Sequence, residues 1–205
     1  MLLRDMSPKS RYQVATYCTA KQIRRKVRHS HRHKGLCATL QDASSRTLTV
    51  TNRLQDKVAL ITGGTNGIGK AAVYGMTKEG AKVVFTGNNT EAGDDIAKET
   101  GAIFVQHAVQ DVEGWERVKA AIRDHHGRLD VPFSNAGTNT GDSDIETVAV
   151  EAWKNLLDVN LTGMMLAIKA SIELMKHNPG ESGGSIVLNS SINGILALSG
   201  DVAYS

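Results

Sequence analysis

Residues 58–69, Val-Ala-Leu-Ile-Thr-Gly-Gly-Thr-Asn-Gly-Ile-Gly, decide the fold of this chain. The apolar run Val58–Ile61 predicts a buried strand, and a helical pattern begins at Ile68, directly after the glycines. A strand, a glycine turn and a helix in this order present bare backbone N–H groups at the helix N-terminus, where the macrodipole favours a phosphate. The stretch therefore predicts a phosphate-binding turn.

The glycines of this turn follow the spacing G-x-x-x-G-x-G, and each has its own predicted role. Gly63 permits the tight turn, Gly67 lets a pyrophosphate approach the backbone, and Gly69 lets the helix pack closely on the strand. Glycine turns also occur in ordinary loops, so the glycines alone do not indicate a nucleotide site. The strand before them and the helix after them favour that interpretation. The predicted cofactor-binding residues of the turn are Gly63, Thr65, Asn66, Gly67, Ile68 and Gly69.

Charge divides the 205 residues into two parts. Residues 1–52 contain eleven Lys and Arg against two Asp, whereas residues 53–205 contain thirteen basic and nineteen acidic residues. The second part is long enough to bury a core of its own. We expect a basic, disordered N-terminal extension over 1–52 and an incomplete dinucleotide-binding domain over 53–205.

Three interpretations of the basic extension remain open. Its wealth of Arg, Ser and Thr and its lack of acids are typical of a targeting peptide, which would make the protein mitochondrial. The Arg and His cluster of residues 21–34 also fits a patch for nucleic acid or an anionic surface. The third interpretation is a solvated, disordered segment, which we favour, with targeting second.

Composition restricts the remaining classes. Both cysteines, Cys18 and Cys37, lie in the extension, so no disulfide framework is expected and a reducing, cytoplasmic location is favoured. No apolar run reaches the roughly 20 residues of a membrane span. The cysteines and nearby histidines lack a familiar metal-ligand spacing, so no metal is expected. Aromatic residues are few, which argues against a nucleic-acid partner.

Strands and helices alternate from Leu54 onward, which predicts an α/β fold with a doubly wound parallel sheet of the Rossmann type. Pro132 conflicts with a central strand position, since it lacks a ladder donor. The five expected strands are 57–62, 82–86, 102–106, 129–134 and 185–189. The expected helices are 68–79, 90–100 with Thr90 as its cap, 111 or 113 to 126, and 151 to about 177.

Polar residues follow several of these strands. Asn88 and Asn89 follow the second strand, Asn135-Ala136-Gly137 follow the fourth, and Ser190-Ser191 follow the fifth. Any one of these groups is explained by turn chemistry. Because the carboxyl ends of parallel strands share one edge of the sheet, together they predict a ligand site there.

These residues together resemble the short-chain dehydrogenase/reductase family from Arg53 to Ser205. The matching motifs are the Thr62-Gly63 turn with Gly67 and Gly69, Asn135-Ala136-Gly137, Asn160 in Val-Asn-Leu-Thr-Gly, Ser191 and Tyr204. The resemblance implies NAD or NADP as cofactor and hydride transfer between a secondary alcohol and a ketone. Small-molecule substrates of that class are the implied partners, with no membrane partner.

The resemblance also implies roles for individual side chains. Tyr204 would exchange a proton with the substrate oxygen, Ser191 would hydrogen-bond that oxygen, and Asn160 would hold a water for proton relay. Asn135 would stabilise the corner after the fourth strand, beside the cofactor. With Asn88, Ala136 and Gly137, these residues complete the predicted site.

The chain departs from the family pattern at its end. Family members carry a lysine four residues after the tyrosine, and that position falls beyond Ser205. We therefore expect a fragment that lacks the catalytic lysine and the C-terminal strands, with a homo-oligomer only for the full-length form. The alternative is an inactive nucleotide-binding remnant, or a protein that binds nucleic acid through its basic extension.

The cofactor positions depart as well. Relatives that prefer NAD carry an acid at the position of Gly87, and those that prefer NADP carry a base at the position of Asn88. This chain has neither, so the preference stays open. The acid that touches adenine in relatives is replaced by Ala108, and Asp111 could substitute only through a shifted loop.

Overall fold

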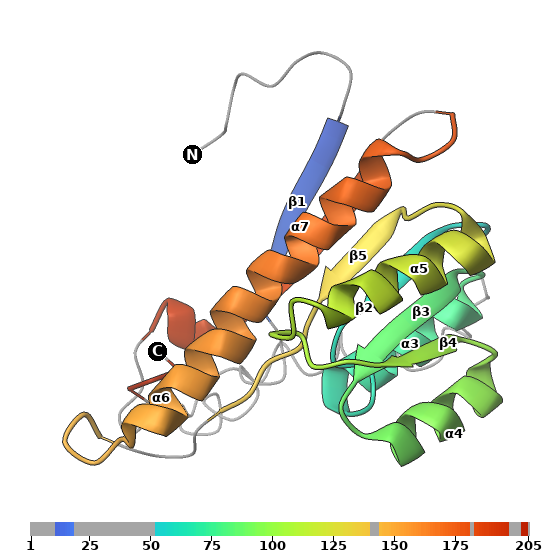
Figure 1. The fold of residues 1–205 in the computed structure, drawn as a ribbon. Helices are drawn as coiled ribbons and strands as arrows, with labels where there is room; N and C mark the ends of the chain where they lie inside the picture. Colours follow the sequence, from blue (N-terminus) through green and yellow to red (C-terminus); the bar gives the residue numbers. More distant parts are fainter. Residues whose placement is uncertain (1–10, 19–51, 140–143, 181–182, 197–201, 205) are drawn as a thin grey trace, which may run out of the picture.

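The computed structural model describes residues 11–18, 52–139, 144–180, 183–196 and 202–204. Its centre is a parallel sheet in the order β1-β6-β5-β2-β3-β4 (Figure 1). The strands are β1 (Arg11–Cys18), β2 (Val58–Ile61), β3 (Lys82–Gly87), β4 (Ile103–Gln106), β5 (Val131–Ser134) and β6 (Gly183–Ser190). The predicted α/β, Rossmann-like class is confirmed.

Helices cover both faces of the sheet, as in a doubly wound fold (Figure 1). On one face, α3 (Gly67–Lys78) and α4 (Thr90–Thr100) pack around Phe85. On the other, α5 (Gly114–His126) and α7 (Gly163–Lys176) pack around Leu60 and Val84. Strand β2 lies between these two clusters and is wholly buried, which explains its unbroken apolar run.

The N-terminal strand corrects the expectation for the extension. Residues 11–18 form β1, which pairs with β6 in parallel from Arg11 opposite Gly183 to Cys18 opposite Ser190. The described sheet therefore has six strands rather than five. The expected disorder therefore does not describe these eight residues, whose backbone pairs with β6, and the division of the chain at residue 52 stays a prediction. Residues 1–10 and 19–51 lie outside the described residues.

Pro132 lies inside β5, a strand with neighbours on both sides. It is the register partner of Leu60 on β2. The pairing of β5 with β6 begins one residue later, at Phe133 opposite Val187. The sheet therefore accepts the proline at a position where the ladder to β6 has not yet begun.

The long helix expected over 151 to about 177 is divided into three pieces. They are α6 (Val150–Leu157), a π-helical turn η3 (Asp158–Thr162) and α7. A π-helical turn widens the backbone spiral by one residue and changes the direction in which its side chains project. Asn160 lies at its centre. The sequence pattern gave the extent of the helix and not this interruption.

A buried amide closes the end of the sheet opposite the predicted site. The side chain of Asn178 accepts from Leu129 N at 2.8 Å and donates to Leu129 O at 2.7 Å and to Gly183 O at 3.1 Å. The Asn178 amide thereby gives the backbone of the buried residue Leu129 the hydrogen-bond partners that a neighbouring strand would otherwise provide.

We expect Asn178→Ala to lower the free energy of unfolding by about 3 kcal/mol, because it leaves a buried N–H and a buried C=O unpaired. Urea denaturation measures the loss. Lys176→Ala, at an exposed position two residues earlier, is the control and should change stability by less than about 0.5 kcal/mol. Equal losses in both variants would contradict the bridging role of Asn178.

Candidate active site

The glycine turn between β2 and α3 is held by close backbone contacts. Gly63 has φ +66°, and a Cβ at this position would lie 2.8 Å from Ala136 Cα. A Cβ at Gly69 would lie 2.0 Å from the carbonyl oxygen of Gly63 and 2.7 Å from Asn135 Nδ2. No side chain fits at either position without moving the helix away from the turn, because the obstructing atoms belong mainly to backbone.

The first turn of α3 is open to an anion. The N-cap residue Asn66 makes no side-chain capping bond, and the first turn contains no acidic residue. Gly67 has φ +50°, and its Cβ position meets no atom within 4 Å. These features leave N–H groups and positive helix-dipole charge facing free space, as a phosphate requires.

Thr62 and Asn135 connect the glycine turn to the end of β5. The Thr62 hydroxyl accepts from Asn135 N and Ala136 N, both at 3.0 Å. The Asn135 side chain donates to Thr62 O at 3.1 Å, and its oxygen accepts from Asn189 Nδ2 at 3.1 Å. The predicted supporting role of Asn135 thus has a geometric basis, since its amide joins β2, β5 and β6.

One cleft of about 760 Å³ lies at the carboxyl ends of the strands. Most of the predicted cofactor residues line it, together with Tyr204. No charged side chain occurs among the described residues of its lining. These residues are Gly63, Thr65, Asn66, Ile68, Gly87, Asn88, Asn89, His107, Val109, Gln110, Asn135, Ala136, Gly137, Thr138, Asn139, Asn155, Val159, Asn189, Asn193 and Tyr204.

Asn160 is fixed by a two-point contact with the loop that follows β5. Its Oδ1 accepts from Thr138 N at 2.7 Å, and its Nδ2 donates to Thr138 O at 2.8 Å. Thr138 itself lines the cleft, whereas Asn160 is not among the lining residues. The π-helical turn and this amide pair together hold the loop after β5 against the helix.

Of the two predicted catalytic hydroxyl residues Ser191 and Tyr204, only Tyr204 is among the residues that line the cleft. Tyr204 is half-buried and lines the cleft. Ser191 follows β6 directly, and its hydroxyl accepts from Asn193 N at 3.3 Å, which caps a short 3₁₀ turn at Ile192–Gly194. Ser191 is not among the cleft-lining residues, although its neighbours Asn189 and Asn193 are.

The far end of the cleft lies between β3 and the glycine turn. Gly87 is buried, and a Cβ there would lie 2.5 Å from Thr65 Cγ2 and 2.7 Å from Thr65 Oγ1. An acidic side chain at this position would therefore require Thr65 to move. Asn89, rather than the expected Thr90, caps α4, because its side chain accepts from Ala92 N at 3.0 Å.

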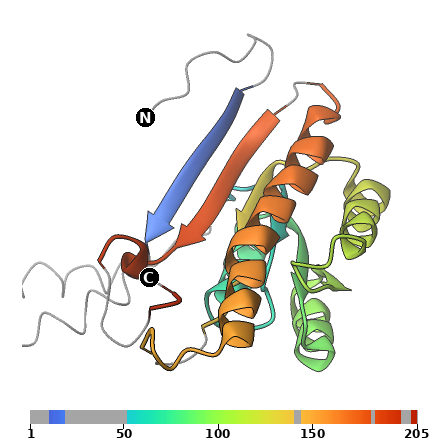
Figure 2. The same ribbon diagram turned by 60° about the vertical axis from the view of Figure 1, so that its left-hand side comes forward.

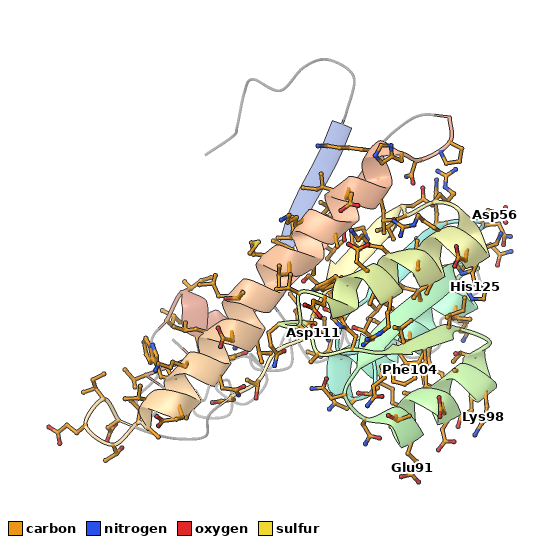
Figure 3. All side chains as sticks on the ribbon, in the orientation of Figure 1. Asp56, Glu91, Lys98, Phe104, Asp111 and His125 are labelled. Carbon is orange, nitrogen blue, oxygen red and sulfur yellow. The ribbon has the colours of Figure 1, made fainter. Side chains whose placement is uncertain are left out.

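Asp111 does not replace the acid that is missing at Ala108. Its carboxylate accepts from Gly114 N at 3.1 Å and so stabilises the start of α5 (Figure 3). Asp111 is exposed and is not a cleft-lining residue. Gln110 and Val109 occupy this part of the lining instead. The shifted loop considered from the sequence does not occur.

His107 lies at the junction of β4 and the cleft. It is 3% exposed, neither ring nitrogen has a hydrogen-bond partner, and its ring packs edge-on against Trp115 with centroids 4.7 Å apart. Burial lowers the pKa of His107, and Arg117 lowers it further, while Asp111 opposes the shift. The folded state therefore favours the neutral form of His107 more strongly than the unfolded chain does.

We expect the protein to lose stability when the pH falls from 7.5 toward 5. The unfolded state, with an ordinary histidine pKa, binds this proton at a higher pH than the folded state does, so acid favours unfolding. His107→Leu should flatten this part of the stability profile, measured as the urea midpoint against pH. His177→Gln, at an exposed position, should keep the parent slope, and a parent slope in His107→Leu would refute the assignment.

Several residues that line or support the cleft were not predicted from the sequence. The lining includes His107, Asn155, Asn189 and Asn193, and Thr62 supports it through its bond from Asn135 N. A signal existed for Asn189, which ends a strand at the same edge of the sheet as Asn88 and Asn135. The others depend on contacts between distant segments.

The described part of the chain holds neither a membrane-spanning helix nor a cluster of metal ligands. None of its helices combines the length and apolar character needed to cross a bilayer. No group of three or more His, Cys, Asp or Glu side chains is arranged to hold a metal ion among those residues.

Comparison with known proteins assigns the family. The profile described as short chain dehydrogenase matches residues 57–205. The chain therefore belongs to the short-chain dehydrogenase family, and the resemblance noted from its motifs is confirmed. Strand β1 lies outside the matched residues.

Individual relatives are dehydrogenases. The chain is 39% identical over 151 residues to an NADP-dependent (R)-specific alcohol dehydrogenase of Lentilactobacillus kefiri, a match that covers 72% of this chain and 59% of the relative. It is 38% identical over 158 residues to a 3-beta-hydroxysteroid dehydrogenase of Comamonas testosteroni, covering 76% and 60%. The chain thus spans about three fifths of the length of these curated relatives.

Proposed function

We propose that residues 53–205 form the nicotinamide-dinucleotide site of an oxidoreductase that interconverts a secondary alcohol and a ketone. The observation that carries this proposal is the cleft itself, in which the glycine turn, the Asn135–Gly137 corner and Tyr204 face one volume of about 760 Å³. A volume of this size, at the carboxyl ends of parallel strands, suits an extended dinucleotide. The family and the names of the relatives support the same reaction class.

The residues present fit such a cofactor. The uncapped first turn of α3 would bind the diphosphate, and Gly63 and Gly69 keep side chains away from it. The ribose and adenine would lie toward Gly87, Asn88 and Gln110. When bound, the nicotinamide accepts or donates the hydride. The chain's own residues then have to bind the substrate oxygen and move its proton.

In this proposal, the Tyr204 hydroxyl exchanges that proton, and the Ser191 hydroxyl donates a hydrogen bond to the substrate oxygen as charge grows on it. Asn160 acts through Thr138, whose backbone N–H and C=O it binds, and would orient a water at the cleft wall. Ser191 can donate its bond to the substrate oxygen while its own oxygen still accepts from Asn193 N. These roles rest on the family motif and on the position of Tyr204 in the cleft lining.

We propose that the site accepts both NADH and NADPH. The described lining contains no carboxylate to repel a 2′-phosphate and no Lys or Arg to pair with it. The space beside Gly87 is occupied by the side chain of Thr65 rather than by an acidic side chain, so the ribose hydroxyls have only neutral partners. The preference between the two dinucleotides should therefore be small. One relative is named as NADP-dependent, which is consistent with access for the larger cofactor.

Isothermal titration of the 205-residue protein with NADH and NADPH tests the proposal. We expect saturable heat with both, with dissociation constants within about ten-fold of each other, a difference of roughly 1.4 kcal/mol. ATP should bind more weakly, because it lacks the nicotinamide half. No heat with either dinucleotide, on protein with a cooperative unfolding transition, would refute the proposal. Binding without turnover in an extended form would instead favour the inactive nucleotide-binding alternative.

A further inference from the structure

Strand β6 is paired over different lengths on its two sides. On the β5 side it has two register partners, Phe133 opposite Val187 and Ser134 opposite Leu188. On the β1 side it is paired along all eight residues, from Gly183 to Ser190 (Figure 2). Its last two residues, Asn189 and Ser190, therefore have only β1 as a neighbouring strand among the described register pairs.

The end of β6 is also the part that reaches the candidate site. Asn189 lines the cleft and donates to Asn135 Oδ1 at 3.1 Å. Ser191 follows Ser190 directly and is the predicted hydrogen-bond donor to the substrate oxygen. In register, Tyr17 lies opposite Asn189 and Cys18 lies opposite Ser190. The backbone that precedes Ser191 is therefore positioned on one side by the N-terminal segment.

We propose that residues 11–18 are a working part of the site, a parallel edge strand that binds β6 of the same chain and holds Asn189 and Ser191 in place. The part that concerns Ser191 rests on the proposed function, whereas the binding to β6 does not. Because β1 lies outside the residues that match the family, this contribution belongs to the chain's own N-terminal sequence.

The sequence of the segment suits this role. Arg-Tyr-Gln-Val-Ala-Thr-Tyr-Cys contains Tyr, Val and Thr, which favour strands, and no glycine or proline. An unpaired edge of β6 would expose a row of N–H and C=O groups and invite pairing between molecules. Pairing within the chain removes that row of open groups and orders the end of β6 at the same time.

Adjacent prolines in the full chain test the dependence of β6 on β1. Alternate residues of an edge strand bond to its neighbour, so Val14→Pro with Ala15→Pro must remove at least one ladder bond. By hydrogen–deuterium exchange, amides of 186–189 should exchange about ten-fold faster or more, while amides of α3 keep their protection. The matched control, Val14→Thr with Ala15→Val, should behave as the parent. Unchanged exchange in β6 would overturn the proposal.

A cross-link tests the register and the origin of the strand. Register partners of a parallel pair lie within the Cα separation that a disulfide spans, so Ser190→Cys should form a bond with the native Cys18 when two thiols are oxidised by added diamide. Cys18→Ser in that background, which keeps Cys37, is the control. A link within one chain between positions 18 and 190 is expected. A link to Cys37, a link between two chains, or no link would overturn the proposal, even if the proline variant fails to fold.

Dinucleotide titration separates this inference from the proposed function. If the cross-link forms as expected but NADH gives no heat, the strand assignment survives and the cofactor proposal fails. If both hold, the proline variant should bind NADH more weakly than its matched control, because Asn189 no longer secures Asn135. Equal affinity for NADH in the proline variant and its matched control would contradict the proposal that β1 supports the site.

Discussion

Replacing Gly69 by alanine is expected to weaken the binding of NADH and NADPH by roughly 100-fold, about 2.7 kcal/mol. The new Cβ would lie 2.0 Å from the Gly63 carbonyl oxygen and 2.7 Å from Asn135 Nδ2, so α3 must move away from the turn. That movement displaces the N–H groups proposed to bind the diphosphate. Isothermal titration gives the dissociation constants, and overpacking should also cost about 1–3 kcal/mol of stability.

Gly75→Ala is the matched control on the same helix. A Cβ at Gly75 meets no atom within 4 Å, so the substitution should leave dinucleotide binding unchanged. It should also stabilise α3 by up to about 1 kcal/mol, because alanine favours helix over glycine. If Gly69→Ala binds NADH as well as Gly75→Ala does, the glycine turn is not the diphosphate site.

Replacing Tyr204 by phenylalanine is expected to lower turnover by about 10²–10⁴-fold, the usual contribution of a positioned proton donor. The measurement requires a form extended past Ser205 with the C-terminal part of the Lentilactobacillus alcohol dehydrogenase, assayed by NADPH absorbance with a ketone. The substitution removes one hydroxyl from the cleft lining and leaves the ring in place. NADPH binding should therefore stay within about two-fold of the parent, since the hydroxyl is proposed to act on substrate.

Tyr74→Phe supplies the control for this loss. The Tyr74 hydroxyl donates to Glu99, a contact between α3 and α4, and Tyr74 does not line the cleft. Its loss should leave turnover unchanged. Full turnover in Tyr204→Phe would remove Tyr204 from the mechanism, and equal losses in both variants would point to a general effect of the hydroxyl deletions on folding.

The sequence predicted those elements whose determinants are local. The apolar run of β2 and the glycines after it predicted a strand, a turn and a helix in that order, and the helix expected to end at Thr100 ends there, although its cap is Asn89 rather than Thr90. The edge of the sheet that carries the site followed from topology, because parallel strands place Asn88 and Asn135 at the same edge. Each of these elements is determined by residues within the element itself or next to it in the sequence.

The features that were missed depend on distant partners. Strand β1 exists because β6 offers it eight register partners, and nothing between residues 11 and 18 alone reveals that pairing. The π-helical turn at 158–162 accompanies the bonds of Asn160 to Thr138, which lies 22 residues earlier. Asp111 was considered as an adenine ligand, yet its carboxylate accepts from Gly114 N at the start of α5.

The described lining of the cleft offers amides and hydroxyls to a ligand rather than charged groups. Asparagine contributes eight of its lining residues, and none of the described lining side chains is an acid, a lysine or an arginine. A dinucleotide would then be held by fixed dipoles, whose attraction falls off over a few ångströms and which release few counterions on binding. Affinity at this site should consequently vary little with ionic strength, whereas a clamp of arginines would weaken as salt rises.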